Sequence, residues 1–475
     1  MLLVQRFRSF LTTPQYQLIP FFIGLLGVVA GDKLVIPSMI VNALLLAFVL
    51  FLSDDLLPAL PPAFFIITLG VSLLANLESV IPYIPFAFPT LAGLLFHLVF
   101  YRRPIFIGDS FYGLVATSVA ILLGGIATPL ETRDYSSGAA IYHLVGLSVG
   151  LIVFYLICAS NRRPNRSYDP IEYFLFSLLL IGLLSSSIIL ENIVEWFVAS
   201  LSVEDPNSRW NTRELWKTFM YRNTLSTLLT MCLPAPFYFA RQTKSRLKEI
   251  IFFFLGIFLY GSALLTTART VMIFTTLLLV ICLIYYLSSR RTVGIKIINI
   301  GICLATACIL LLTFREPLKA LLEIPNLKEI IASDEARVVY LRRSFDDFMN
   351  HPLFGIGLTS TANLDVSSVG NGGIQWYHLY FPQIWGSMGI LGLCAYTFQS
   401  VMRAAVIFTK PNSQSIALGL VYLGLFLYSQ TDPGEFTPIP FTVLAIVAFV
   451  LLEGRLRTMQ TVEFRTADGS VKKTR

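Results

Sequence analysis

Apolar runs of about 20 residues recur along almost the whole chain, and each is long enough to cross a bilayer as an α-helix. Charged residues make up only 13% of the 475 residues, about half the share found in soluble domains. Stretches of about ten residues with alternating polarity, which build outer-membrane barrels, are absent from the sequence. The pattern predicts an all-α polytopic membrane protein with about 12–14 transmembrane helices. The apolar segments are centred near Leu25, Leu44, Ile67, Leu91, Val119, Val149, Leu180, Leu229, Phe254, Leu278, Leu304, Leu391, Gly424 and Ala445.

Basic residues gather in the short loops between these segments, where they report on orientation. With the N-terminus inside, every cluster follows an even-numbered segment and is expected to be cytoplasmic. Topology therefore explains the net charge of +7 better than nucleic-acid binding does. We expect one integral membrane domain over residues 1–455, a cytoplasmic polar tail over 456–475, and both termini inside. The clusters are Arg6 and Arg8, Arg102–Arg103, Arg162–Arg163 with Arg166, Arg241 to Lys248, Arg290–Arg291, the region of Arg403 and Lys410, and the C-terminus.

The longest polar stretch, about residues 314–377, is then expected to face outward. Ser333 is the predicted N-cap of a helix, with two acidic residues in the first turn. Apolar residues follow at helical spacing, and Pro352 ends the helix. We expect amphipathic helices that lie on the membrane surface over a cavity. The spaced apolar residues are Val338, Leu341, Phe345 and Phe348.

Charged side chains close to membrane depth are candidates for function, because inserting one at mid-span costs about 2.5–3.5 kcal/mol. Arg269 stands between two apolar runs with almost no loop, on the outer side, where basic residues are disfavoured. It either contacts a ligand or extends toward the outer headgroups. Arg222 and Asn223 precede the segment around Leu229 and are candidate substrate-binding residues, although nearby acids could balance the charge of that loop.

Three further arginines share the predicted helix of the outer loop. Arg342 and Arg343 have Asp346 and Asp347 at helical spacing, which favours ion pairs within the helix, while both arginines remain candidate substrate-binding residues. Arg337 has no acidic residue after it at that spacing, and its acidic neighbours lie upstream. We therefore take Arg337 as a candidate catalytic residue, with a salt bridge as the alternative.

Among the four histidines, His378 alone stands where the outer loop meets an apolar segment, directly after Trp376 and Tyr377. This is an interfacial position that faces a wet cavity. The other three histidines are explained by helix contacts or by a loop position. His378 is therefore the candidate catalytic histidine.

Several familiar catalytic motifs are missing, including the metalloprotease and nucleotide-binding signatures. The string Gly146–Gly150 has the spacing of a nucleophile elbow but lies inside an apolar segment, where small residues pack helices together. The two acidic pairs of the large loop are explained by the helix start and by the neighbouring arginines. We expect no metal site and no cofactor. Outward-facing arginines without a metal site suit an anionic leaving group such as a diphosphate.

The string His351-Pro-Leu-Phe-Gly-Ile-Gly-Leu358 resembles the "hPlfGvGl" signature of the O-antigen ligase and Wzy-type polymerase superfamily. That family has an arginine about fourteen residues before the signature, where Arg337 stands, and an aromatic residue after it, here Tyr340 in place of the usual Trp. Downstream it has a histidine, here His378, followed by Leu379 where Asn is usual. The stretch 386–393 then resembles the family's "GilGl".

Two upstream stretches extend the resemblance to about residues 205–400. Thr266 to Arg269 resembles the family's "SR" at the outer start of a span, and Tyr221 to Thr224 resembles its "N-x-x-a". The resemblance implies a metal-independent, inverting glycosyltransferase of the bacterial inner membrane. Its donor is an undecaprenyl-diphosphate-linked glycan, and its acceptor is a glycan, a lipid A core or a protein. Its key groups correspond to Arg269, Arg337 and His378.

The residues and the resemblance suggest one mechanism. Two arginines hold the donor diphosphate as the sugar C1–O bond breaks, and His378 accepts the proton of an acceptor hydroxyl. Trp376 and Tyr377 stack on sugar rings or belong to an interfacial aromatic belt. A ligase and a polymerase remain open, and a small-solute transporter is the third alternative. Broken helices with midplane charges and internal repeats, which are typical of transporters, are not evident.

Overall fold

The computed structural model describes residues 2–73, 85–101, 104–129, 138–160, 167–202, 222–266, 268–289, 294, 296–302, 305, 327–360, 377–432 and 434–467. The chain divides into two compact units. The first unit comprises Met1–Tyr101, Glu172–Ile330 and Leu420–Tyr428, and the second comprises Arg102–Ile171, Ile331–Gly419 and Ser429–Arg475.

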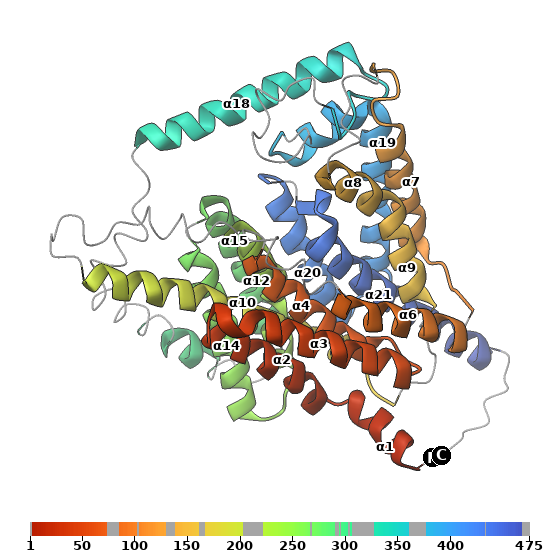
Figure 1. Ribbon diagram of the computed structural model, residues 1–475, viewed down its shortest axis with the longest axis vertical. Coiled ribbons are helices and arrows are strands. Elements are labelled where there is room, and N and C mark those ends of the chain that lie inside the picture. Colours follow the sequence, from red (N-terminus) through yellow and green to blue (C-terminus); the bar gives the residue numbers. More distant parts are fainter. Residues whose placement is uncertain are drawn as a thin grey trace. The chain divides into compact units, whose positions relative to one another are not determined.

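The first unit is a set of apolar helices joined by short turns. Thr13 caps its second helix by accepting a hydrogen bond from the Tyr16 amide, and Pro14 occupies the first turn, where a missing N–H is harmless. Gln17 joins this helix to the long α10 through the carbonyl of Tyr173 and the hydroxyl of Ser177. The helices in Figure 1 are α1 (Leu2–Leu11), α2 (Pro14–Val29), α3 (Asp32–Leu52), α4 (Leu60–Leu73), α6 (Phe88–Phe100), α10 (Pro170–Leu201), α12 (Arg222–Cys232), α13 (Pro234–Gln242), α14 (Arg246–Leu265) and α15 (Arg269–Leu287).

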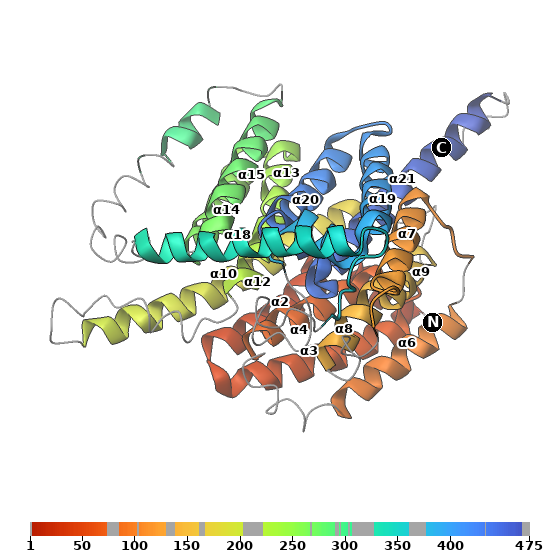
Figure 2. The ribbon, with the colours of Figure 1, turned by 90° about the horizontal axis from the view of Figure 1, so that it is seen from above.

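The second unit is built around two helices that lie side by side, α7 and α19 (Figures 1 and 2). Glu453 of α21 reaches the start of α7, where its carboxylate accepts hydrogen bonds from the amide and hydroxyl of Ser110 at 2.8 and 2.6 Å. A carboxylate is favourable there because the first amides of a helix lack partners. The elements are α7 (Asp109–Leu123), α8 (Gly138–Val145), the π-helical η5 (Gly146–Gly150), α9 (Leu151–Ala159), α18 (Leu327–Asn350, mostly in this unit), α19 (Tyr380–Phe408), η6 (Gly434–Phe436), η7 (Pro438–Thr442) and α21 (Val443–Ala467), while α20 (Ser413–Ser429) is shared by the two units.

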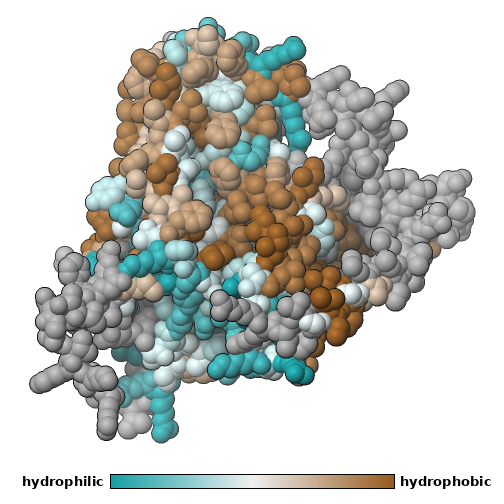
Figure 3. Space-filling model, turned by 180° about the vertical axis from the view of Figure 1, so that it is seen from behind, coloured by the Kyte–Doolittle hydropathy of each residue, from teal (hydrophilic) through white to brown (hydrophobic). Residues whose placement is uncertain are grey.

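The expected all-α polytopic membrane fold is confirmed. Within the described ranges, helices are the regular structure, and hydrophobic residues cover much of the surface coloured in Figure 3. The segment around Leu229 forms two short helices, α12 and α13, joined at Leu233, and Leu304 lies outside the described residues. Six further apolar helices are shorter than the candidate membrane spans. Those spans are Lys33–Leu52, Ile141–Ala159, Pro170–Leu201, Arg246–Leu265, Tyr380–Phe408 and Pro438–Met459.

The string Gly146–Gly150 is helical, as the packing interpretation requires. It forms one π-helical turn between α8 and α9, with Ser148 buried and its hydroxyl donating to the carbonyl of Leu144. A nucleophile elbow needs a strand-to-helix turn, which this segment does not form.

The helix of the outer loop begins earlier than expected. The predicted start at Ser333 is wrong, because α18 begins at Leu327, while its end at Asn350 agrees with a stop before Pro352. The apolar Ile330 and Ile331 continue the helical pattern upstream of the serine. A serine inside a helix costs at most about 0.7 kcal/mol relative to alanine, so the helix extends through it.

The apolar stripe of α18 faces away from the rest of its unit. Val338, Leu341 and Phe345 are exposed, whereas Ser344 and Asp347 on the opposite face are buried. The hydroxyl of Ser344 accepts a hydrogen bond from the indole of Trp385, on α19, at 3.0 Å. The helix is amphipathic as expected, and its polar face is the one that packs on the protein.

A sharp bend divides α19 into two arms at Gly389 (φ 61°, ψ −150°). The rings of Tyr380 and Tyr396 lie 6.1 Å apart, although a straight helix would separate these residues by about 24 Å. The first arm therefore folds back along the second. His378 stands two residues before the first arm.

The signature string 351–358 forms a brace across this bend through four backbone hydrogen bonds. A β-carbon at Gly355 or Gly389 would meet backbone atoms at 2.4 Å, and both residues have φ of 61°, which favours glycine. The glycines of the signature therefore serve close backbone packing. The four amides are those of Ile356, Gly357, Ile390 and Leu391, which donate to Gly386, Ser387, Pro352 and Leu353 at 2.9, 2.9, 2.8 and 3.2 Å.

Arg403 is not a loop charge. It lies on the second arm of α19 and is buried, with its guanidinium 3.2 Å from the carboxylate of Glu435. Arg403 is therefore a buried partner of Glu435 and not a loop residue, so it does not report on the position of a loop. The orientation predicted from the other basic clusters does not depend on Arg403.

Replacing Gly389 with alanine is expected to destabilise the protein. An L-residue in the left-handed region costs about 1–2 kcal/mol, and the contact with the Pro352 carbonyl adds to this. The midpoint of thermal unfolding, followed by size-exclusion chromatography in detergent, should fall by several degrees. Gly261→Ala on α14 is the matched control, because its β-carbon would meet no atom within 4 Å. Equal midpoints for the two variants would contradict the bracing role.

Candidate functional site

The predicted site residues are divided between the two units. Arg222 is the first residue of α12 and Arg269 the first of α15, both in the first unit, and their side chains lie outside what the structure describes. Asn223 is exposed, and its carbonyl accepts the hydroxyls of Ser226 and Thr227, which continue the first turn of α12. Both arginines therefore begin helices in the first unit.

The second unit brings Tyr340 close to His378, and Arg337 lies one helical turn before Tyr340. The rings of Tyr340 and His378 lie 5.4 Å apart. Arg337 precedes Tyr340 by three residues on α18, which puts the two on one face of the helix. Arg337 is half-buried, and no described side chain forms an ion pair with it.

His378 has a strained backbone, with φ of 53°. A histidine in the left-handed region costs about 1–2 kcal/mol, and such strain persists only where neighbours impose it. The neighbour here is Tyr377, whose amide donates to Gln383 at 3.0 Å and whose hydroxyl donates to Asp347 at 2.7 Å. These bonds fix the chain before His378, while the helix that begins at Tyr380 fixes it afterwards.

Asp432 faces the histidine from the segment between α20 and α21. Its Oδ1 lies 3.8 Å from Nδ1 of His378, and both side chains are a little over one-third exposed, at 38% and 35%. The other ring nitrogen, Nε2, is then the one available to a substrate hydroxyl.

Arg343 and Tyr377 both contact Asp347. The expected ion pair of Arg343 with Asp347 is confirmed at 3.8 Å. The pair expected for Arg342 with Asp346 does not form, and both are exposed within the described part of α18. Tyr377 is fully buried, so its ring supports the loop, and its geometry does not favour sugar stacking. Trp376 lies outside the described residues.

Sequence reasoning missed two carboxylates, Asp432 and Glu435. Both lie in the short polar interval between the apolar segments centred near Gly424 and Ala445. The rule that draws attention to charges near membrane depth applies to them as it does to Arg269. The sequence does not show that this interval lies beside His378, because the two are more than 50 residues apart along the chain.

Replacing Tyr377 with phenylalanine tests whether this residue supports the loop. The ring is kept, but the buried carboxylate of Asp347 loses a donor at 2.7 Å. Hydrogen bonds to charged groups contribute about 1.5–3 kcal/mol, so the thermal midpoint should fall by several degrees. The exposed Tyr112 on α7 is the control, since Tyr112→Phe should leave the midpoint unchanged. An unchanged thermal midpoint in Tyr377→Phe would argue against this hydrogen bond.

Comparison with known proteins agrees with the resemblance of the motifs. Residues 251–397 match the family model described as O-antigen ligase. No curated protein matches the chain. The matched segment contains Arg269, Arg337 and His378, whereas Asp432 and Glu435 lie beyond it. Over this segment, the chain is similar to the O-antigen ligase family.

Proposed function

We propose that this protein is a glycosyltransferase that moves a glycan from an undecaprenyl-diphosphate carrier to an acceptor hydroxyl, in the manner of an O-antigen ligase. The observation that carries the proposal is the setting of His378 inside the family-matched segment. It is about one-third exposed, faces the carboxylate of Asp432, and contacts Tyr340, which shares a helix face with Arg337. The proposed location is the outer face of the bacterial inner membrane.

The proposed reaction is a displacement at the anomeric carbon. Nε2 of His378 accepts the proton of the acceptor hydroxyl, and the acceptor oxygen forms a new bond to C1 of the donor sugar. The bond between C1 and the diphosphate oxygen breaks, and the diphosphate leaves with the electron pair. Attack from the side opposite the leaving group inverts the configuration at C1.

Arginine suits the leaving group in this reaction. A guanidinium stays charged and donates two parallel hydrogen bonds to phosphate oxygens, so it stabilises charge as it develops on the diphosphate. Arg337 lies one helical turn before Tyr340 on α18, which supports this role for it. The resemblance assigns the same role to Arg269. Arg342, exposed on α18, remains a candidate for contact with the carrier or the glycan.

Asp432 is proposed to orient the imidazole. Its carboxylate faces Nδ1, which keeps Nε2 toward the acceptor, and its charge stabilises the imidazolium formed by proton transfer. The roles proposed for His378, Asp432 and the arginines require no metal ion.

Deletion of the gene followed by gel analysis of surface glycans and carrier-linked glycans tests the proposed function. If the protein is a ligase, long chains will accumulate on the carrier and disappear from the surface. Surface glycans limited to single repeat units would identify a polymerase. No change in either glycan pool would contradict the proposed glycosyltransferase activity and favour a transporter.

Complementation of that deletion should fail with His378→Ala, because a general base contributes about 10²- to 10⁴-fold to the rate. His351→Ala is the matched control from the same unit, since its amide and carbonyl, which bond to Asp347 and Gly355, are unchanged by the substitution. It should restore the wild-type glycan pattern. Protein levels in the membrane are compared by immunoblot. Restoration by His378→Ala would contradict the base role.

In purified protein, Asp432→Asn should lower kcat about tenfold or more, within the total contribution of the base. The KM for the donor should change little, because Asp432 faces the histidine on the acceptor side of the proposed reaction. Initial rates with an undecaprenyl-diphosphate-linked oligosaccharide give both constants. An effect confined to KM would place Asp432 in donor binding.

A further inference from the structure

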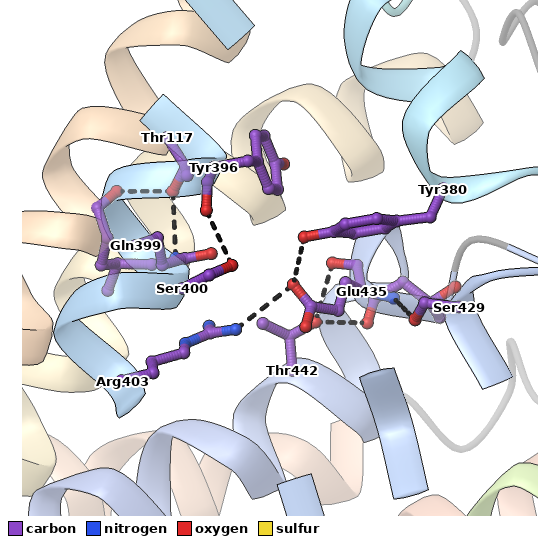
Figure 4. A network of polar contacts seen from close by, with 11 residues as sticks. Thr117, Tyr380, Tyr396, Gln399, Ser400, Arg403, Ser429, Glu435 and Thr442 are labelled. Atoms are coloured by element: carbon purple, nitrogen blue, oxygen red, sulfur yellow. Dashed lines mark hydrogen bonds and ion pairs between the residues drawn. The ribbon is translucent and has the colours of Figure 1, made fainter. Parts of the chain in front are cut away.

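A buried ion pair lies close to the candidate histidine. One oxygen of Glu435, Oε2, accepts hydrogen bonds from Arg403 at 3.2 Å and from the hydroxyl of Tyr380 at 3.4 Å. The Arg403 and Glu435 side chains are only 4% and 2% exposed. Figure 4 shows Tyr380 and Arg403 approaching Glu435 from opposite sides. The two donors belong to the two arms of α19, so this carboxylate joins the arms below the bend.

The segment that carries Glu435 is itself held firmly. The Glu435 amide donates to the hydroxyl of Ser429 at 3.0 Å, and its carbonyl accepts from Thr442 at 3.1 Å. Phe436 stacks on Tyr396 with ring centres 5.2 Å apart. The carboxylate therefore has little freedom to follow a displaced partner.

One oxygen of the Glu435 carboxylate lacks a hydrogen bond within the described part of the chain. Among the described residues, Oε1 of Glu435 is buried without a hydrogen bond. Taking two charges out of water is unfavourable, and a buried pair is often no more stable than apolar residues of the same volume. A contribution to stability is therefore a weak explanation for this ion pair. Its position next to the candidate histidine suggests a functional explanation.

Two contacts in succession link the start of α19 to the segment 432–435. His378 faces Asp432, and Tyr380, two residues later, donates to Glu435, three residues after Asp432. The second contact is anchored by Arg403 on the other arm. Displacing Glu435 would therefore move the turn of His378 and the carboxylate of Asp432 relative to each other.

We propose that Arg403, Glu435 and Tyr380 are positioning residues, which hold the His378 imidazole against Asp432 for proton transfer. This inference rests on the proposed function and adds three residues to it that lie outside direct contact with the substrate. Its signature is a loss of kcat at nearly constant donor KM, because the arginines that bind the diphosphate are left in place.

The test separates charge balance from positioning through two double variants. Arg403→Met alone leaves a buried carboxylate without its cation, and kcat should fall at least tenfold. Adding Glu435→Gln removes that charge but keeps an oxygen for the Tyr380 hydroxyl, so kcat should recover to within about threefold of wild type. Adding Glu435→Leu instead removes the charge and the acceptor together, so kcat should stay low. Equal kcat values for the two double variants would overturn the proposal.

Single variants with a matched control complete the design. Tyr380→Phe should lower kcat without changing donor KM. Glu453→Gln is the control, because Glu453 is another buried carboxylate of the same unit and contacts Ser110 and Tyr155 instead. It should lower the thermal midpoint and leave the kcat of the folded fraction unchanged. A similar loss of kcat in Glu453→Gln would show that the ion pair only stabilises the fold, which would contradict the positioning role.

A second measurement is independent of glycan transfer. Diethyl pyrocarbonate modifies accessible histidines, and the rate at His378 can be followed by mass spectrometry. Arg403→Met should raise this rate severalfold, and Arg403→Met with Glu435→Gln should return it toward wild type. If wild-type protein transfers no glycan, the proposed function fails, yet this rate still tests the positioning. An unchanged rate in Arg403→Met would overturn the inference by itself.

Discussion

Four backbone hydrogen bonds hold the loop 351–358 against the bend of α19, and the position of His378 depends on them. They form only because Gly355 and Gly389 allow two backbones to approach closely. With the bend in place, the first arm of α19 folds back along the second, and His378 stands two residues before it. Without it, the histidine would stand at the end of a straight span, far from Asp432.

The bend also explains why polar groups can lie inside an apolar unit. Glu435 receives donors from both arms of α19, and Asp347 receives Tyr377 from just before the first arm. Glu435 is thus paired and hydrogen-bonded by residues that a straight helix would hold far apart, and Asp347 by Arg343 and Tyr377. Burying these charges without such partners would be energetically unfavourable. The buried carboxylates Asp347 and Glu435 and the folded-back arm therefore depend on each other.

Much of the fold could be predicted from the sequence because membrane-spanning helices are defined by local composition. Apolar length alone located most of the helices, and helical spacing located α18. The bend could not be predicted, because Gly389 lies in a stretch that is apolar on both sides and reads as one span. Asp432 and Glu435 were missed for the same reason, since their importance comes from a contact between segments that are distant along the chain. The buried position of Arg403 could not be predicted either, because a charge count cannot distinguish a loop residue from a buried partner.

The brace has a consequence for recognising distant relatives. It is made by amides and carbonyls, so most side chains of the string 351–358 do not take part in its hydrogen bonds. Substitutions at Leu353 or Phe354 leave those bonds intact, whereas an inserted or deleted residue would put every donor out of register with its acceptor. A profile for such proteins should therefore weigh the spacing between glycines, and their distance from the histidine, above the identity of the residues between them.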